Sequence, residues 1–230
     1  MLPHEIQEFS SYPNVLAFLE RHVSMQFGDV REMLRLPLPA LQMTHACNFA
    51  AAGTLCGLIS GISVSIYQPP KTTEMKKIKG IKQKVWVGTG YAFRHLLKDF
   101  YPWGAGQNPD ILSAAVYDYF RNPLAHALGV HSNVACRIEI SRLALVDQYG
   151  VRQETGLTKE QVKELGQLTA RPSWAGPGLT GSGNNWTLLI DGFYRDMIEM
   201  LQKLARSSAQ MSAAESRFQQ GKLIWRSGTP

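Results

Sequence analysis

The segment Ala46–Tyr67, ACNFAAAGTLCGLISGISVSIY, contains no charged residue and decides how the chain is organised. It is long enough to cross a bilayer as one helix, but serine, threonine and asparagine interrupt it and large aliphatic side chains are few. Gly53, Gly57 and Gly61 recur every fourth residue, a spacing that lets helix backbones pack closely in membranes and in water. We therefore expect a buried helix of a soluble bundle. A membrane anchor at residues 46–67 is the less favoured alternative, because the chain offers no second span.

Apolar residues at helical spacing predict further helices on both sides of this segment. Proline-containing stretches separate them, since proline interrupts a helix interior. Asn14 is a candidate N-cap for the first helix, and Asn108 before Pro109 is typical of the start of another. The expected helices span about Asn14–Leu34, Ala40–Tyr67, Thr73–Phe100, Pro109–Phe120 and Leu188–Ala209.

The pattern of the sequence changes after Gly129. Residues Arg137–Val146 alternate between apolar and polar, which predicts a strand or hairpin. The Pro/Gly/Ser-rich stretch Arg171–Asn185 is expected to be a loop. We predict a mainly α fold in a single domain, residues 1–230: a helical core of about 13–130 and 187–209, an inserted small β-hairpin/helix excursion of about 134–186, and a loose tail of about 210–230.

The charge balance points to an anionic partner. The formal net charge is +6, which suits nucleic acid or an acidic membrane surface. Residues 71–84 hold six lysines against one glutamate, and aromatic residues follow. We expect this stretch to bind a nucleic-acid backbone. An ordinary solvated helix face is the alternative. The candidate nucleic-acid-binding residues are Lys76, Lys77, Lys79, Lys82 and Lys84.

Cysteine usage and the N-terminus indicate a cytoplasmic protein. The three cysteines, Cys47, Cys56 and Cys136, form no CxxC pair, so we expect reduced thiols and a reducing compartment. The first residues carry acidic side chains and no apolar run, which argues against a secretory signal. No zinc-ligand spacing, Walker loop or dinucleotide fingerprint occurs, so we expect no metal and no cofactor.

Arg121, Asn122 and His126 are the residues best suited to chemistry. Arg121 is a permanent cation, and histidine titrates near neutral pH. On an unbroken helix, residues five apart point roughly 140° away from each other. Proline disfavours the α conformation in the residue before it, so Pro123 predicts a helix break at Asn122 that turns Arg121 toward His126. A dimer that pairs the arginine of one protomer with the histidine of the other is the alternative.

Such a pair suits RNA cleavage without metal. His126 would take the proton of a ribose 2′-hydroxyl as general base. Arg121 would bind the scissile phosphate and stabilise its growing negative charge. Asn122 would assist by hydrogen bonding, and Asp118, one helical turn before Arg121, would orient the guanidinium or the imidazole. The candidate catalytic residues are Arg121, Asn122, His126 and Asp118.

Arg121-Asn122 followed by His126, within an apolar helical frame, resembles the motif of the HEPN superfamily (higher eukaryotes and prokaryotes nucleotide-binding). The resemblance covers six residues, and residues 137–185 align to nothing in the family. It implies a helical bundle that often dimerises across the motif. It also implies metal-independent endoribonuclease activity, frequently in toxin–antitoxin or anti-phage defence systems. RNA or a nucleotide, a second copy of the chain and an antitoxin are the implied partners. Some members keep the bundle as a non-catalytic nucleotide- or protein-binding module, and this alternative stays open.

Overall fold

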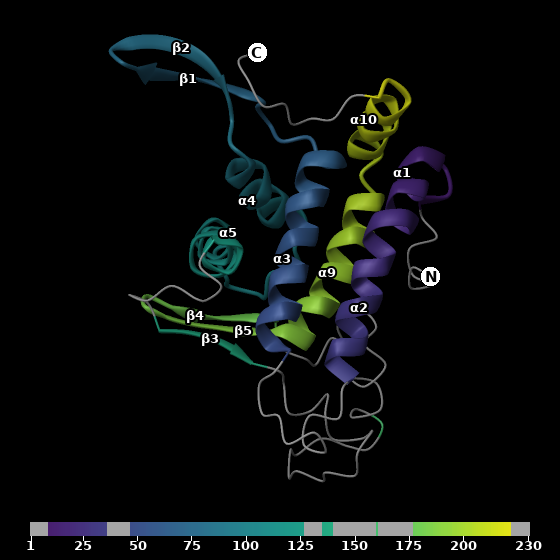
Figure 1. The fold of residues 1–230 in the computed structure, drawn as a ribbon, viewed down its shortest axis with the longest axis vertical. Coiled ribbons are helices and arrows are strands. Elements are labelled where there is room, and N and C mark those ends of the chain that lie inside the picture. Colours follow the sequence, from purple (N-terminus) through teal and green to yellow (C-terminus); the bar gives the residue numbers. More distant parts are fainter. Residues whose placement is uncertain (1–8, 36–46, 127–134, 140–159, 161–176, 222–230) are drawn as a thin grey trace.

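The computed structural model describes residues 9–35, 47–126, 135–139, 160 and 177–221, and within these the chain is mainly helical, as predicted. A helical bundle forms the body, and two small sheets lie at its periphery (Figure 1). The elements in chain order are α1 (Pro13–Phe18), η2 (Leu19–Val23), α2 (Ser24–Arg35), α3 (Asn48–Ser65), β1 (Thr73–Ile78), β2 (Ile81–Trp86), α4 (Thr89–Phe100), α5 (Pro109–Ala115), η3 (Val116–Arg121), α6 (Asn122–His126), β3 (Ala135–Glu139), β4 (Leu179–Ser182), β5 (Asn185–Leu189), α9 (Ile190–Ala205) and α10 (Ser208–Gln219).

Helix α3 is the central helix of the bundle, as the uncharged segment predicted. It contacts α2, α4 and α9 (Figure 1), and its large aliphatic side chains Leu55, Leu58, Ile59 and Ile62 are buried. The glycine row behaves differently from the prediction. A Cβ atom placed on Gly53, Gly57 or Gly61 would meet nothing within 4 Å. Among the described residues, the glycine row therefore does not serve close packing between helix backbones.

The length and composition of α3 also satisfy the requirements of a membrane span. Its 18 residues have a mean hydropathy of 1.3, and half of that window is buried inside the protein. It is the one such helix in the part of the chain that the structure describes. A core helix can have the same length and hydropathy, and the packing of α3 against three other helices accounts for its apolar composition.

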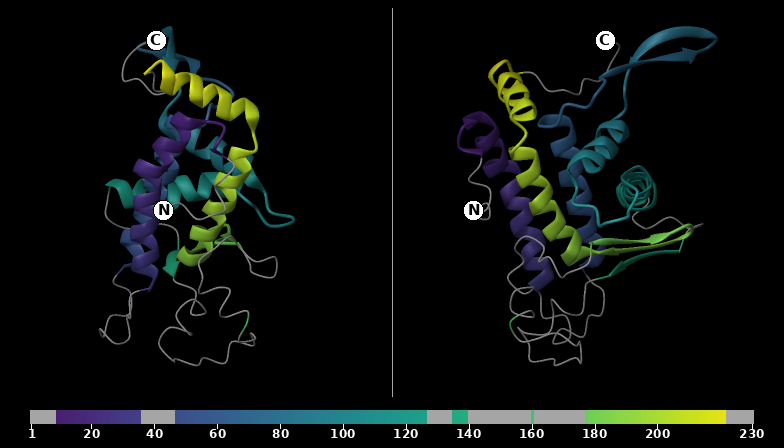
Figure 2. Two further views of the ribbon diagram at one scale, coloured as in Figure 1. Left: turned by 90° about the vertical axis from the view of Figure 1, so that its right-hand side faces the viewer. Right: turned by 180° about the vertical axis from the view of Figure 1, so that it is seen from behind.

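The predicted helix over residues 73–100 is wrong in its first half, where the chain forms the hairpin β1–β2. Lys79 and Gly80 both adopt positive φ, 50° and 85°, which is the geometry of a tight two-residue hairpin turn. β-branched side chains at both ends of the strands favour extended backbone. The hairpin projects from the bundle, and the helix α4 starts only at Thr89 (Figures 1 and 2).

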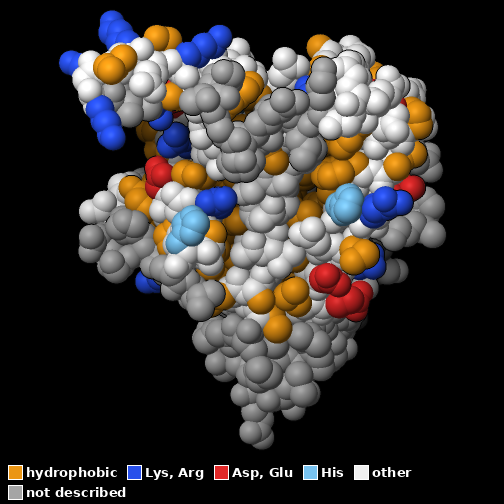
Figure 3. All heavy atoms as spheres, turned by 45° about the horizontal axis from the view of Figure 1, so that its top comes forward, with side chains coloured by type: hydrophobic (Ala, Val, Ile, Leu, Met, Phe, Trp, Pro, Cys, Tyr) orange, Lys and Arg blue, Asp and Glu red, His pale blue; other side chains and the backbone are white. Residues whose placement is uncertain are grey.

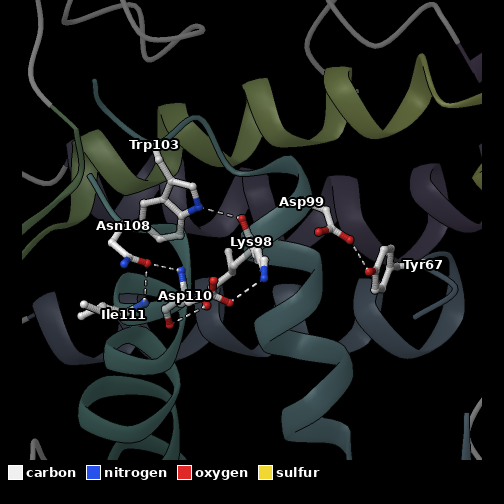
Figure 4. Close-up of polar contacts among 9 residues, drawn as sticks. Tyr67, Lys98, Asp99, Trp103, Asn108, Asp110 and Ile111 are labelled. Carbon is white, nitrogen blue, oxygen red and sulfur yellow. Dashed lines mark hydrogen bonds and ion pairs between the residues drawn. The ribbon is translucent and has the colours of Figure 1, made fainter. Parts of the chain in front are cut away.

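Helices α4 and α5 are joined by a polar network that fixes the start of α5 (Figure 4). The Asn108 side chain accepts hydrogen bonds from the backbone N–H groups of Asp110 and Ile111, at 3.0 and 3.3 Å, and so caps α5 as predicted. Lys98 Nζ lies 2.7 Å from Asp110 Oδ1. The Trp103 indole donates to the Leu97 carbonyl oxygen at 2.9 Å. The helix that carries the motif is therefore anchored to α4 at its first turn.

A three-stranded sheet, in the order β3-β5-β4, lies beside the start of α9. Strand β5 runs parallel to β3 and antiparallel to β4. The predicted strand thus lies at 135–139, and the rest of the stretch to residue 146 is outside the described residues. The predicted loop Arg171–Asn185 is wrong over β4. Asn48 donates to the Ile138 carbonyl oxygen at 3.1 Å, which ties the start of α3 to this sheet.

The chain does not become loose at residue 210 as predicted. Helix α10 continues to Gln219 and buries Met211, Ala214 and Glu215 against the bundle. Its Glu215 carboxylate accepts backbone hydrogen bonds from Asn14 and Val15 at the start of α1. The N-cap of α1 is therefore a carboxylate from the far end of the chain, and the Asn14 side chain does not serve as the cap.

Candidate functional site

The helix that carries the motif does not break at Asn122. This residue has φ −65° and ψ −50°, which are helical values, so the chain is helical from Pro109 to His126. The predicted helix break at Asn122 is therefore wrong. A wide π turn, η3, comes directly before Pro123, and the Asn122 N–H donates to the carbonyl oxygen of Tyr117. Such a turn relieves the crowding between a proline ring and the preceding turn, which lets the helix continue.

Arg121 is held in place by three contacts. Its Nε donates to Ser60 Oγ on α3 at 3.2 Å, and its Nη1 donates to Asn122 Oδ1 at 2.9 Å. Its guanidinium carbon lies 5.4 Å from the centre of the Tyr117 ring, within the range of a cation–π contact. Asn122 therefore orients Arg121. Half-buried and bonded on two sides, Arg121 is positioned in advance for any anion that it binds.

His126 lies at the end of α6 and is exposed to solvent. Because the helix is continuous between the two residues, the side chains of Arg121 and His126 point roughly 140° apart. The predicted convergence of the pair within one chain is therefore wrong. Only the arrangement between two protomers remains compatible with a shared site.

Asp118 does not take part in this group. It is exposed, and among the described residues it forms no hydrogen bond or ion pair with Arg121 or His126. The prediction that it orients either side chain is therefore wrong. The geometry instead brings a second cation close, because the guanidinium carbon of Arg94 on α4 lies 5.3 Å from the same Tyr117 ring. Tyr117 thus brings two arginines into one neighbourhood.

Comparisons with protein-family models, with curated proteins and with solved structures found no match for the chain.

The predicted nucleic-acid-binding lysines all lie on the hairpin β1–β2 and are exposed. Residues 71–86 contain six lysines and one glutamate, a net charge of +5 out of +6 for the whole chain. Figure 3 shows these basic side chains gathered on the projecting hairpin at the upper left, with hydrophobic side chains among them. The rest of the molecule is almost neutral in sum. The net positive charge of this protein is therefore concentrated on the hairpin β1–β2.

Among the described residues, some lysines of this segment form ion pairs and the others do not. Lys76 and Lys71 lie 3.0 and 3.5 Å from the carboxylate oxygens of Glu74. The hydrogen bond from Lys76 holds the pKa of Glu74 below its ordinary value, so the carboxylate stays charged near neutral pH. Within the described part of the chain, no ion pair is formed by Lys77, Lys79, Lys82 or Lys84.

Sequence reasoning missed a buried ion pair in α9. Arg195 and Asp191 lie 3.1 Å apart one helical turn from each other, and both side chains are almost fully buried. The next residue, Asp196, accepts hydrogen bonds from the Tyr101 hydroxyl and from the Gly178 backbone N–H. The spacing of four residues was visible in the sequence, but burial was not. Asp196 thus joins α9 to the end of α4 and to the segment before β4, and all three charged side chains are buried.

The described residues support neither a metal site nor a cysteine nucleophile. No group of three or more histidine, cysteine, aspartate or glutamate side chains there is arranged to hold a metal ion. All three cysteines are free thiols, and burial raises the pKa of Cys56 to about 12, with the nearby Arg121 acting in the opposite direction. The Cys56 thiol is therefore protonated at neutral pH and unsuited to act as a nucleophile.

Proposed function

We propose that this protein binds RNA and that the hairpin β1–β2 is its binding arm. The observation that carries the proposal is the concentration of charge. A net +5 of the chain's +6 lies on sixteen residues that project from a nearly neutral body. Neutralising phosphates with lysines releases condensed counterions, which drives nucleic-acid binding without sequence preference. Three free cysteines suit a cytoplasmic protein, and this is where we place the activity.

The test is binding of fluorescent single-stranded RNA by the whole chain, measured by anisotropy at several salt concentrations. A variant with glutamine at the five exposed hairpin lysines should lose most of its affinity and most of its salt dependence, because both arise from phosphate contacts. Arg21→Gln together with Lys203→Gln removes exposed cations from the body and should leave binding within twofold. Undiminished binding by the five-lysine variant would refute the proposal.

Metal-independent endoribonuclease activity in a homodimer is the second candidate. It is supported by the fixed position of Arg121 over the Tyr117 ring that Arg94 also contacts, by the exposure of His126, and by the space at the glycine row of α3 among the described residues. In this proposal Arg121 of one protomer holds the phosphate. His126 of the other removes the 2′-hydroxyl proton, and the 2′-oxygen attacks phosphorus while the bond between phosphorus and the 5′-oxygen breaks. This leaves a cyclic phosphate, and the departing 5′-oxygen takes a proton from water to become a free hydroxyl. Defence or toxin activity, with an antitoxin partner, belongs to this proposal.

Mixing variants tests the shared site. Arg121→Ala and His126→Ala should each abolish cleavage of RNA in EDTA, and an equimolar mixture of the two should recover about a quarter of the activity. The recovery arises because mixed dimers carry one intact Arg–His pair. Cleavage by either variant alone at the wild-type rate, or cleavage that requires a metal ion, would refute the shared Arg121–His126 site. No cleavage by the wild type would leave only the non-catalytic binding protein. A chain that is recovered entirely in the membrane fraction would instead support the anchor at residues 46–67.

A further inference from the structure

The two faces of the hairpin β1–β2 differ in chemistry. In the observed register Thr73 pairs with Trp86, Met75 with Lys84, and Lys77 with Lys82. Because side chains alternate between the faces of a strand, paired residues share a face. We name the face that carries Met75, Lys77, Lys82, Lys84 and Trp86 the lysine–tryptophan face. The opposite face carries Glu74, Lys76, Gln83 and Val85.

We infer that the lysine–tryptophan face binds single-stranded RNA, with lysines on successive phosphates and Trp86 stacked on a base. This inference rests on the proposed RNA-binding function and adds which face is used and which form of RNA it takes. Lys76 on the opposite face is already occupied, because it pairs with Glu74, as does Lys71 before the start of β1. The lysines on the lysine–tryptophan face are exposed and have no carboxylate partner among the described residues.

Lys77 and Lys82 stand directly opposite each other across the two strands. Like charges in this position repel and destabilise the pairing of strands. No described carboxylate relieves the repulsion. A phosphate placed between the two ammonium groups would attract both and offset their repulsion. Binding an anion should therefore stabilise the hairpin.

Trp86 supplies a base-stacking surface on the same face. It is half-buried, it is not among the side chains that pack against the hydrophobic core, and it makes no ring contact with another described aromatic residue. Lys82, Lys84 and Trp86 are each two residues apart, which is roughly 7 Å along a strand. A basic row that ends on an aromatic ring is how proteins commonly hold single strands, since unpaired bases offer their faces for stacking. Bases inside a duplex do not.

The arrangement favours RNA over an acidic membrane. Ile81, a large apolar side chain near the tip that is 64% exposed, belongs to the face opposite the free lysines. Membrane-surface binding requires the apolar and basic groups to meet the bilayer together. On this hairpin Met75 is the one strongly exposed aliphatic side chain on the lysine–tryptophan face among the residues described.

Two double variants that remove equal charge test the inference. Lys82→Gln with Lys84→Gln alters the lysine–tryptophan face, and Lys71→Gln with Lys76→Gln alters the lysines paired with Glu74. We expect the first to weaken binding of a fluorescent oligouridine at least tenfold in low salt. It should also lower the slope of log affinity against log salt by about 1.4, since each single-strand contact contributes about 0.7. The second should change affinity less than threefold.

Trp86→Phe should remove most RNA-induced quenching of tryptophan fluorescence, and Trp86→Ala should weaken binding about tenfold. An RNA duplex of equal length should bind at least tenfold more weakly than the single strand. Circular dichroism of each variant checks that the hairpin and bundle remain folded. If the wild type binds no RNA, the proposed function itself fails. If it binds RNA but both double variants weaken it equally, or if duplex RNA or anionic vesicles bind as well, only the present inference is overturned.

Discussion

Glu215 and Arg217, two residues apart on α10, bind opposite ends of two different helices. The Glu215 carboxylate accepts hydrogen bonds from the Asn14 and Val15 N–H groups at the N-terminus of α1, at 3.1 and 3.0 Å. Arg217 Nη2 donates to the Ile66 carbonyl oxygen at the C-terminus of α3, at 2.7 Å. Each charge meets the end of a helix dipole that it stabilises. α10 therefore clamps the first helix to the central one.

Glu215→Gln should destabilise the protein by about 1–2 kcal/mol, because an amide is a weaker acceptor than a carboxylate for N-terminal N–H groups and lacks its charge. Urea unfolding followed by circular dichroism measures the change. Ser212→Ala on the same helix is an exposed control and should have almost no effect. Equal stability of wild type and Glu215→Gln would contradict the capping role.

Stability should fall in acid through the same carboxylate. Burial alone raises the pKa of Glu215, but the hydrogen bonds from Val15 and Asn14 outweigh burial and lower it below its ordinary value. A depressed carboxyl pKa adds stability that is complete above the unfolded-state value of about 4.3. This stability is lost as the pH falls toward the lower folded value. In urea titrations at several pH values, Glu215→Gln should show a shallower loss of stability below pH 5 than the wild type.

Two ion pairs of the same geometry on α9 should contribute differently to the free energy of unfolding, because only one of them is buried. Arg195–Asp191 and Lys203–Glu199 have the same spacing of four residues and the same N–O distance of 3.1 Å. Asp191→Asn should cost about 3–5 kcal/mol, because it replaces the carboxylate of a buried ion pair with a neutral amide. Glu199→Gln should cost less than about 1 kcal/mol, since water screens the partly exposed pair. Similar losses in chemical denaturation would argue against the burial of Arg195.

The glycine row of α3 should tolerate substitution by alanine. Gly57→Ala should stabilise the monomer by up to about 1 kcal/mol, because glycine is a poor helix former and the added methyl group meets no atom within 4 Å. Thermal unfolding at low protein concentration measures this effect. Gly57→Leu tests whether this side of α3 also forms a dimer interface. If protomers pack there, leucine should lower the dimer fraction in sedimentation, whereas an unused face should leave the oligomeric state unchanged.

The sequence allowed the helices to be predicted because their apolar spacing and their caps are local. Asn108 caps α5 as expected, and α3 is the buried helix that its composition indicated. The hairpin β1–β2 was missed because its lysines dominate the pattern and lysine is compatible with a helix. The deciding signal was Lys79-Gly80 between two β-branched stretches, since glycine readily takes the positive φ that a tight turn requires.

The geometry around Arg121 was not predicted from the sequence. The Asn122-Pro123 pair was expected to break the helix, but a π turn absorbs the proline and the helix continues. Ser60, which fixes Arg121, lies 61 residues away in sequence, and such a partner comes only from tertiary packing. The same limit applies to Tyr117, whose role depends on α4 bringing Arg94 to the same ring.

The clamp formed by α10 has a consequence for biosynthesis. The hydrogen bond between Val15 and Glu215 spans 200 residues, so the N-terminus of α1 stays uncapped until nearly all of this sequence has left the ribosome. At typical rates of translation, roughly 5–20 residues per second, that interval is on the order of ten to forty seconds. During this time the apolar side of the first helix has no final partner. The nascent chain is therefore expected to depend on chaperones until the last helix emerges.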